Sequence, residues 1–342
     1  MPEIQTRFRR AVDEFDPDYV LITDTWNMKP LLAEAVRGYP YFLPFQALKC
    51  LCPLNNLRLL PLGPDRVEQC PRHQLATPEV CHRCVAERGQ HSGLLHQRER
   101  ALAGVGTPAY NRQLRRALDE AEAVLVLNPS TGEMIRPYAP RVRVVTWGMD
   151  PARFPWPLPD KPTNEKTRIF MAAVVVESIK GFHVIHQACH SLWQSRRDFE
   201  LVVTGDPPGQ VDDFTRFVGW ADQKELPRHY RESDICVVPT IAQEGLSRTS
   251  VEAMASGLPV VASRIGGLPY TVTDGVTGLL FEPGDADDLA RKLTVLLDDP
   301  ALRRTMGQAG RRRFEADFTW DVVIERDYRP LFNADFREGE ID

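Results

Sequence analysis

The chain of 342 residues lacks any apolar run near the roughly 18 residues that a membrane-spanning helix needs. Its opening, MPEIQTRFRRAVDEF, lacks the apolar core of a signal peptide. It also lacks a positive excess, because 42 Lys and Arg stand against 47 Asp and Glu, for a net charge of -5. These absences disfavour a membrane-spanning, an exported and a nucleic-acid-binding protein in turn. We therefore expect a cytoplasmic protein with no nucleic-acid partner.

Cysteine is scarce outside one segment. Five of the seven cysteines lie within residues 50 to 84, and they are Cys50, Cys52, Cys70, Cys81 and Cys84. Without an export signal, disulfides are not expected. The two-residue gap of the CHRC motif, residues 81–84, lets two thiolates bind one metal ion. One interpretation is a structural zinc ion held by four thiols, or by fewer thiols with His73 or His82, and the other is a group of reduced loop cysteines. The zinc ligands that we predict are Cys52, Cys70, Cys81 and Cys84.

The length suits two domains, each with its own core. From about residue 165, short β-branched runs alternate with helical patterns. The predicted strands are 168–176, 200–205, 234–240 and 258–263, and the predicted helices are 180–193, 223–232 and 248–256. Near-continuous apolar strands separated by helices indicate a parallel sheet covered on both faces. This half is predicted to be doubly wound α/β.

Further helical patterns follow towards the end of the chain. The stretch GDADDLARKLTVLL, residues 284–297, predicts a helix with Asp285 as its N-cap and acidic residues in its first turn. A second helical pattern covers 301–315. Residues 318–332 predict a terminal amphipathic helix before an acidic tail.

The first half is less regular, and we predict that it is α/β as well. Its predicted strands are 18–24, 40–45, 123–128 and 141–147, and its predicted helices are 28–37 and 108–121. Residues 151–165 contain five prolines and no periodicity, which indicates a linker. The expected domains are 1–150, with the Cys-rich insert 50–84, then 166–317 after the linker, and a terminal segment 318–342.

The stretch EGLSRTSVEAMASG, residues 244–257, places Glu244 and Glu252 eight positions apart. Glu244 follows the strand 234–240, and ligands bind at this carboxyl edge of open parallel sheets. Backbone N–H groups at the start of the following helix could bind phosphate, and the two carboxylates could accept hydrogen bonds from sugar or ribose hydroxyls. The alternative is that Thr249 and Glu252 form a capping box.

The second half resembles the retaining glycosyltransferases of family 4. The likeness is carried, in order, by KG at 180–181, ELVVTGD, RFVGW, ESDICVVPT, EGLSRTSVEAMASGLPVVASRIGGLP and TDGVTGLLFEPGD, and then by the FTW helix. It implies a GT-B architecture of two Rossmann-like lobes with parallel sheets, the N-terminal one incomplete, and with residues 318–332 packing back toward that lobe. It also implies a hexosyltransferase-type reaction, in which a sugar passes from a UDP- or GDP-linked donor to a hydroxyl acceptor with retention at the anomeric carbon. No metal or other cofactor is needed for that chemistry.

The resemblance also assigns the site. Glu244 would contact the donor sugar, Glu252 the nucleotide ribose and Lys180 the diphosphate. Gly266 and Gly267 either allow close approach of the donor or form a strand-to-helix turn. The implied catalytic residues are Glu244 and Lys180, and the implied donor-binding residues are Glu252, Ser247, Arg248, Thr249, Gly266, Gly267, Trp220 and Ala221. The last two would receive the base, although Trp220 could instead cover the sheet edge.

Several features depart from the family pattern. Val174 stands where the family usually has arginine, Tyr270 follows Pro269 where glutamate is common, and Gln46 and Ala47 occupy a position where histidine is frequent. The usual opening strand and glycine-rich loop have no counterpart before residue 18, so we expect either an upstream start or a reduced lobe. These departures leave open the alternative of a non-catalytic sugar-nucleotide-binding or regulatory protein. A third alternative is a sugar-nucleotide epimerase, because that chemistry also occurs on the architecture that the resemblance implies.

The acceptor is expected to be a glycan, a lipid-linked molecule or a small hydroxyl compound. Basic groups lie at 7–10, 112–116 and 311–313. We interpret them as solvated helix faces. A second interpretation is peripheral contact with an anionic membrane, where a lipid-linked acceptor would reside.

Overall fold

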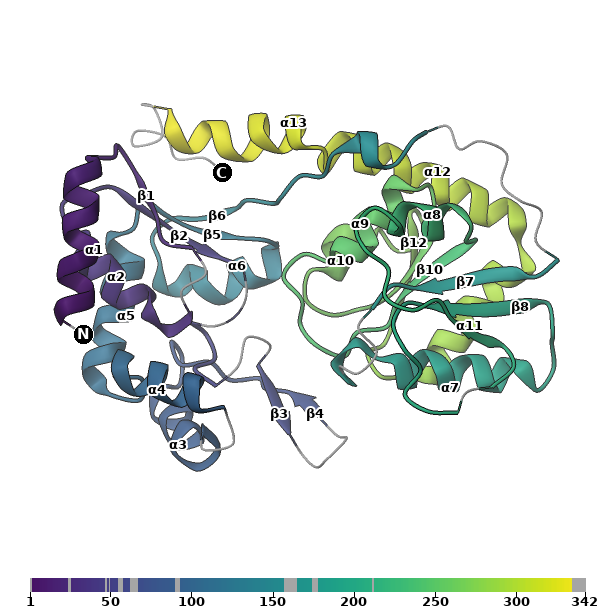
Figure 1. Ribbon diagram of the computed structural model, residues 1–342, viewed down its shortest axis with the longest axis horizontal. Coiled ribbons are helices and arrows are strands. Elements are labelled where there is room, and N and C mark those ends of the chain that lie inside the picture. Colours follow the sequence, from purple (N-terminus) through teal and green to yellow (C-terminus); the bar gives the residue numbers. More distant parts are fainter. Residues whose placement is uncertain are drawn as a thin grey trace. The chain divides into compact units, whose positions relative to one another are not determined.

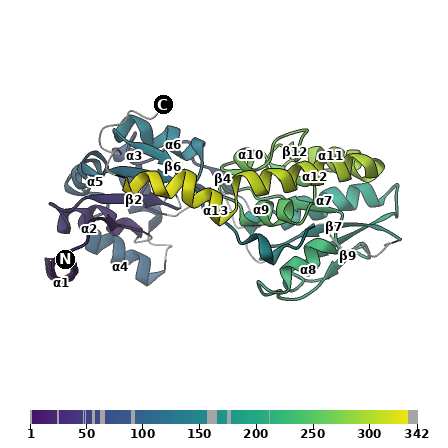
Figure 2. The same ribbon diagram turned by 90° about the horizontal axis from the view of Figure 1, so that it is seen from above.

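The computed structural model describes residues 2–23, 26–46, 48, 50–54, 58–61, 67–89, 93–156, 165–173, 178–210 and 212–333. The chain divides into an N-terminal unit, residues 1–145, and a C-terminal unit, residues 146–342 (Figure 1). Figure 2 shows the same two units from above. The division falls just before the predicted linker, residues 151–165. Residues 157–164 of this linker lie outside the described residues. Among the helices described, none is long and apolar enough to cross a membrane.

The N-terminal unit is built on a parallel sheet with the strand order β1-β2-β5-β6. These strands are β1 (Val20–Leu21), β2 (Tyr41–Phe45), β5 (Ala123–Val126) and β6 (Val142–Val144). All four predicted strands are thus confirmed, although each is shorter than its sequence pattern. A small antiparallel pair, β3 (Leu59–Pro61) and β4 (Val67–Gln69), lies in the Cys-rich insert.

Helices surround this sheet. They are α1 (Pro2–Phe15), η1 (Trp26–Met28), α2 (Lys29–Ala35), α3 (Pro78–Arg88), α4 (Leu94–Ala103), α5 (Pro108–Glu120), α6 (Pro129–Ile135) and η3 (Arg136–Tyr138). The predicted helices at 28–37 and 108–121 are confirmed as η1 with α2 and as α5. Leu43 of β2 and Leu114 of α5 belong to one buried apolar cluster, which holds helix and sheet together.

The C-terminal unit contains a parallel sheet with the strand order β12-β11-β10-β7-β8-β9. The strands are β7 (Thr167–Met171), β8 (Phe199–Val203), β9 (Thr215–Phe217), β10 (Ile235–Val238), β11 (Val260–Ser263) and β12 (Gly278–Phe281). The four strands predicted here are confirmed as β7, β8, β10 and β11. Because all neighbouring strands are parallel, their carboxyl ends meet at one edge of the sheet.

The helices of this unit follow the predicted pattern closely. They are η4 (Pro151–Arg153), η5 (Ser178–Lys180), α7 (Phe182–Trp193), α8 (Leu226–Arg231), α9 (Arg248–Ala255), α10 (Leu268–Thr271), α11 (Ala286–Asp298) and α12 (Pro300–Asp317). The predicted N-cap of α11 is confirmed, because Asp285 Oδ1 accepts a hydrogen bond of 2.8 Å from the backbone N–H of Asp288.

The two faces of the C-terminal sheet carry different helices (Figure 1). Side chains alternate along each strand, so neighbours in β7 point to opposite faces. Ile169 belongs to the apolar cluster that includes α7 and α11. Phe170 instead meets Tyr230 of α8 edge-to-face, with 5.1 Å between ring centroids. The second face therefore supports α8 and α9, on which two residues of the candidate site lie.

The terminal segment differs from the single amphipathic α-helix predicted for 318–332. It consists of a short α13 (Trp320–Val323), the π-helical η6 (Ile324–Tyr328) and the 3₁₀-helical η7 (Arg329–Phe332). Pro330 has no backbone N–H and its ring clashes with the preceding turn, so regular α-helical bonding cannot continue through it. The predicted packing of this segment toward the first lobe stays a prediction.

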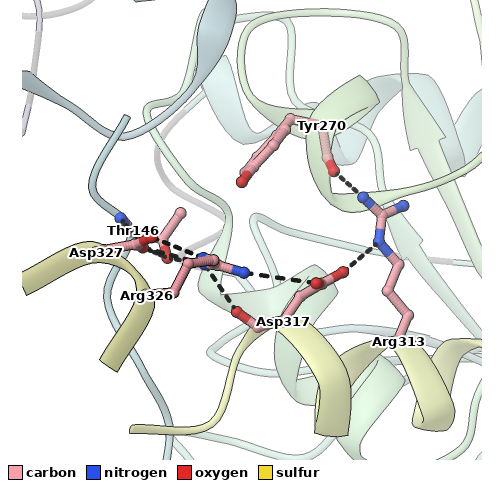
Figure 3. A network of polar contacts seen from close by, with 6 residues as sticks. All are labelled: Thr146, Tyr270, Arg313, Asp317, Arg326 and Asp327. Carbon is pink, nitrogen blue, oxygen red and sulfur yellow. Dashed lines mark hydrogen bonds and ion pairs between the residues drawn. The ribbon is translucent and has the colours of Figure 1, made fainter. Parts of the chain in front are cut away.

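Polar contacts tie the first residue of the C-terminal unit to this segment (Figure 3). The backbone N–H and the hydroxyl of Thr146 both donate to Asp327 Oδ2, at 3.0 and 2.8 Å. Arg326 pairs with Asp327 and also donates to the backbone carbonyl of Asp317 at 3.2 Å. These charge-assisted bonds hold the entry of the chain into the C-terminal unit against η6.

The basic group at 311–313 was interpreted as a solvated helix face, but one of its arginines is buried. Arg311, the first of the arginines at 311–313, is buried with 6% exposure. Its Nη1 donates to the carbonyl of Phe154 at 2.8 Å and to that of Ala255, the last residue of α9. The last carbonyls of a helix have no partner within the helix, and a guanidinium satisfies such a group well.

Candidate functional site

A tight turn places Lys180 beside the segment that follows β10. Lys180 ends η5, and Gly181 precedes α7 with a φ of +77°. A Cβ atom at Gly181 would lie 1.9 Å from the carbonyl oxygen of Pro239, so only glycine fits there. The N–H of Ile241 donates to the carbonyl of Ile179 at 2.9 Å, which joins the two segments just before Lys180.

Lys180 and Glu244 form an ion pair. Lys180 Nζ lies 2.9 Å from Glu244 Oε1, and the side chains are 33% and 18% exposed. An ammonium group has three donors, and this contact uses one of them. The structure therefore brings the two predicted catalytic residues together and leaves the lysine able to bind an anion as well.

The glycine pair lies against the backbone of Glu244. Gly266 has a φ of +58°, and a Cβ atom there would lie 2.6 Å from the carbonyl oxygen of Glu244. The N–H of Gly267 donates to the same carbonyl at 2.9 Å, and α10 begins directly after Gly267. The strand-to-helix turn is thus confirmed, while close approach of a donor to these glycines stays a prediction.

Helix α9 is not capped by the capping box of Thr249 and Glu252 that the sequence left as an alternative. Its N-cap is Ser247, whose hydroxyl accepts a hydrogen bond from the N–H of Ser250. The capping box of Thr249 and Glu252 is wrong, because the helix begins at Arg248 and Glu252 already lies in its second turn. The Glu252 side chain points elsewhere, and its Oε2 accepts a hydrogen bond of 3.0 Å from the hydroxyl of Tyr230.

Glu252 has one oxygen without a partner among the described residues. The residue is 3% exposed, and its Oε1 is buried with no hydrogen bond. Burial raises the pKa of Glu252, whereas the Tyr230 hydroxyl and the charges of Arg248 and Arg153 lower it. A buried acceptor left without a donor costs about 1–3 kcal/mol, so this atom is suited to a ligand hydroxyl.

Two arginines and a glutamine lie near this carboxylate. Arg153 Nη2 donates to Gln223 Oε1 at 2.8 Å, and Arg248 Nη2 donates to the same oxygen at 3.4 Å. The Arg248 guanidinium also lies over the ring of Trp147, 5.5 Å from its centroid. The sequence patterns did not single out Tyr230, Arg153 or Gln223, since each meets the site only through tertiary contacts.

The chain matches a known protein family over the segment that carries these residues. Residues 165–299 match the family described as "Glycosyl transferases group 1". This segment therefore resembles the group 1 glycosyltransferases. Glycogen synthase of Mycobacterium tuberculosis is 30% identical over 208 residues, which cover 58% of this chain and 50% of that protein. The chain spans about half the length of the curated relatives it matches.

Solved structures resemble this chain over nearly all of its length. Sucrose-phosphate synthase of Thermosynechococcus elongatus superposes with a TM-score of 0.67 at 21% identity, covering 97% of this chain and 78% of that one. HepE of Anabaena, solved in complex with UDP, gives 0.67 at 16% identity, covering 94% of this chain and 80% of that one. These likenesses confirm the predicted fold, an α/β GT-B architecture with parallel sheets.

Trp220 and Ala221 lie just before Gln223, which accepts hydrogen bonds from both Arg153 and Arg248. Trp220 is 76% exposed, so the alternative that it covers the sheet edge is wrong. Gln223 follows two residues after Ala221 and accepts from Arg248 at the start of α9. The loop is therefore linked to the start of α9, and contact of Trp220 or Ala221 with a base stays a prediction.

Tyr270, which departs from the family pattern, has a structural role. Its carbonyl accepts a hydrogen bond of 2.6 Å from Arg313 (Figure 3). Its ring also meets Phe318 edge-to-face, with 6.4 Å between ring centroids. Of the other departures, Gln46 is exposed, whereas Val174 and Ala47 lie outside the described residues.

The four cysteines predicted as zinc ligands line one cavity of about 430 Å³ in the N-terminal unit. They are Cys52, Cys70, Cys81 and Cys84. None of the four forms a disulfide with another described cysteine, and burial raises the pKa of Cys81 to about 11. Within the described ranges, no three His, Cys, Asp or Glu side chains lie in an arrangement that could hold a metal ion. The structure thus places the thiols around one space without forming a finished metal site.

Gly181→Ala is expected to destabilise the C-terminal unit by about 1–3 kcal/mol, or to displace Lys180, because both the positive φ and the Pro239 carbonyl oppose a Cβ atom. Gly284→Ala is the matched control, since Gly284 has a φ of +80° but a Cβ atom there would meet no other described atom within 4 Å. Thermal unfolding of both variants measures the difference. Equal losses would show that the close approach to Pro239 contributes nothing.

Proposed function

We propose that this protein is a retaining glycosyltransferase that moves a sugar from a nucleoside-diphosphate sugar to a hydroxyl acceptor. The observation that supports this most is the contact of Lys180 Nζ with Glu244 Oε1 inside the segment that matches the group 1 glycosyltransferase family. This contact pairs a cation suited to bind a diphosphate with a carboxylate suited to accept hydrogen bonds from sugar hydroxyls. Both lie beyond the carboxyl ends of parallel strands, where open α/β sheets bind ligands.

The proposed roles follow from the charge that develops during transfer. The bond between the anomeric carbon and the diphosphate breaks, a bond from that carbon to the acceptor oxygen forms, and the acceptor's proton leaves with the diphosphate. Lys180 stabilises the growing negative charge on the diphosphate, assisted by the free N–H groups at the start of α9. Glu244 orients the sugar, and Glu252 accepts a hydrogen bond from the ribose.

The donor is proposed to be a UDP- or GDP-sugar. HepE of Anabaena, which shares the fold, was solved in complex with UDP. A ribose hydroxyl would supply the donor that the buried Oε1 of Glu252 lacks among the described residues. For the acceptor, we propose a hydroxyl of a glycan, a lipid-linked molecule or a small compound.

Incubation of the purified protein with UDP-, GDP- and ADP-sugars and a panel of hydroxyl acceptors tests this function. We expect nucleotide release coupled to glycosylation, and nuclear magnetic resonance of the product should show the anomeric configuration of the donor. Nucleotide binding without turnover would instead indicate a non-catalytic protein. A changed sugar without transfer would indicate an epimerase, and either result would overturn the proposal.

We also propose that the cavity of the four cysteines holds a structural zinc ion. Four sulfur ligands are typical of structural zinc sites, and metal binding would deprotonate the thiols. Since no three of these described thiols form a ligating arrangement in the structure, binding would have to draw them together.

Purified protein is expected to contain about one zinc ion per chain by elemental analysis, a ratio that follows from one closed four-ligand site. The double variant Cys81→Ser, Cys84→Ser should lose the metal and melt at a lower temperature. Cys189→Ser is the control, because Cys189 is buried on α7 of the other unit. Wild-type protein that stays metal-free after incubation with zinc under reducing conditions would contradict this proposal.

A further inference from the structure

Tyr230 is buried beneath the candidate ribose site. It is 0% exposed, and its ring is held edge-to-face by Phe170 at 5.1 Å and by Phe154 at 6.5 Å. Its hydroxyl donates to Glu252 Oε2 at 3.0 Å. A rigid ring thus delivers one hydrogen bond to one oxygen of a buried carboxylate.

The two oxygens of Glu252 have different surroundings. Oε2 accepts from Tyr230, whereas Oε1 is buried without a partner among the described residues. The carboxyl group is planar, so a bond that holds Oε2 also fixes the direction of Oε1. Without that bond, the terminal torsion of a glutamate side chain is broad, and either oxygen could turn toward a ligand.

We propose that Tyr230 is a positioning residue for nucleotide binding, which orients Glu252 so that Oε1 accepts a hydrogen bond from the ribose. The inference rests on the proposed function, because it takes a ribonucleoside diphosphate as the ligand. It adds to that function the residue by which the protein distinguishes ribose from deoxyribose. A site built to bond a hydroxyl rejects the analogue that lacks it, since its own polar group is then left unpaired.

The surroundings of Glu252 give this inference a pH signature. The groups that face it are Tyr230 on α8, Arg248 on its own helix, Arg153 on η4 and Cys236 on β10. Burial raises the pKa of Glu252, and the Tyr230 hydrogen bond lowers it. Removal of the hydroxyl therefore raises this pKa further. Because the carboxylate accepts more strongly than the acid, ribose binding should weaken as pH falls, and it should do so from a higher pH in Tyr230→Phe.

The test measures binding of UDP and GDP, with their 2′-deoxy and 3′-deoxy forms, to full-length protein by calorimetry. For the nucleotide that binds, we expect wild type to favour the ribose form by about 10- to 100-fold over at least one deoxy form. Tyr230→Phe should reduce this ratio to a few-fold. In Tyr230→Phe, the KM for the sugar donor should rise about tenfold while kcat stays unchanged, because a positioning contact acts on binding.

The matched control is Tyr41→Phe. Tyr41 is also buried, and its hydroxyl donates to the carbonyl of Ala117 at 2.9 Å in the N-terminal unit. The Tyr41→Phe variant should leave nucleotide affinity, the ribose preference and the pH profile unchanged.

Replacement of Tyr230 by 3-fluorotyrosine keeps the hydroxyl and strengthens it as a hydrogen-bond donor. That variant should therefore retain the ribose preference and shift the midpoint of the pH profile downward. This second variant keeps the inference testable if Tyr230→Phe does not fold.

The outcomes separate the inference from the function on which it rests. If wild type binds ribo and deoxy forms equally, the ribose role of Glu252 is wrong, and Tyr230 has nothing to position. If wild type discriminates and Tyr230→Phe does so equally well, the inference is wrong while the proposed function stands. If neither UDP nor GDP binds wild type, both are overturned.

Discussion

Lys180→Met is expected to lower kcat/KM for sugar transfer by about 10²–10³-fold. The substitution keeps a long apolar stem and removes the ammonium group that contacts Glu244 at 2.9 Å. Only the N–H groups at the start of α9 would then oppose the negative charge that grows on the departing diphosphate. Steady-state kinetics with a saturating acceptor measure the effect, and kcat should fall more than affinity for the free nucleoside diphosphate.

Lys292→Met is the matched control for this prediction. Lys292 lies on α11 and is not part of the proposed site. It should leave kcat/KM within about twofold of wild type, as expected for a surface substitution. A Lys180→Met enzyme with wild-type kcat would contradict the role of Lys180 in the chemical step. Glu244→Gln completes a double-mutant cycle, and the two losses should be far from additive because the side chains are in contact.

Glu252→Ala is expected to weaken binding of the nucleoside diphosphate by about 10- to 100-fold while the fold is retained. A hydrogen bond to a charged group contributes about 1.5–3 kcal/mol, and the variant loses the acceptor proposed for the ribose. The substitution leaves the buried Tyr230 hydroxyl without its acceptor, which should cost about 1–3 kcal/mol of stability and is offset in part by removal of a buried carboxylate, so the fold should be retained. Calorimetric titration and circular dichroism measure the two quantities.

The comparison for Glu252→Ala is Glu282→Ala, which removes a carboxylate that is 66% exposed in the same unit. That variant should bind nucleotide as wild type does. Unchanged affinity in Glu252→Ala would refute the ribose assignment. Because burial raises the pKa of Glu252, wild-type affinity should also fall on acidification at a higher pH than an ordinary carboxyl would give. Glu252→Ala should lose this component of the pH profile.

Most of the strands that were predicted correctly are buried over most of their length. The exceptions are β1 and β6, and the pattern missed β12 although it is largely buried. All four residues of β10, Ile235–Val238, are buried, and such apolar runs are visible in the sequence. The pattern missed β9, Thr215–Phe217, whose residues are half-buried or exposed at the sheet edge. It also missed α3 and α4 in the N-terminal unit, since their polar sequences show little amphipathic periodicity.

The sequence by itself determined which residues were candidates. The spacing of Glu244 and Glu252 and the Lys180–Gly181 pair were enough for a resemblance to glycosyltransferases, because these motifs are local. It could not decide between a capping box and a ligand-binding carboxylate, since both need the same residue types at the same spacing. That choice depends on where α9 begins, and packing set its start at Arg248.

Only the tertiary structure decided which candidates meet. Lys180 and Glu244 are 64 positions apart, and they come together because β7 and β10 pair side by side and the turn at Gly181 lies against Pro239. Tyr230 had no motif around it, and its importance comes from a 3.0 Å contact with another helix. Contacts between separate elements leave no period in the sequence, so the partner of each carboxylate could be found only in the folded chain.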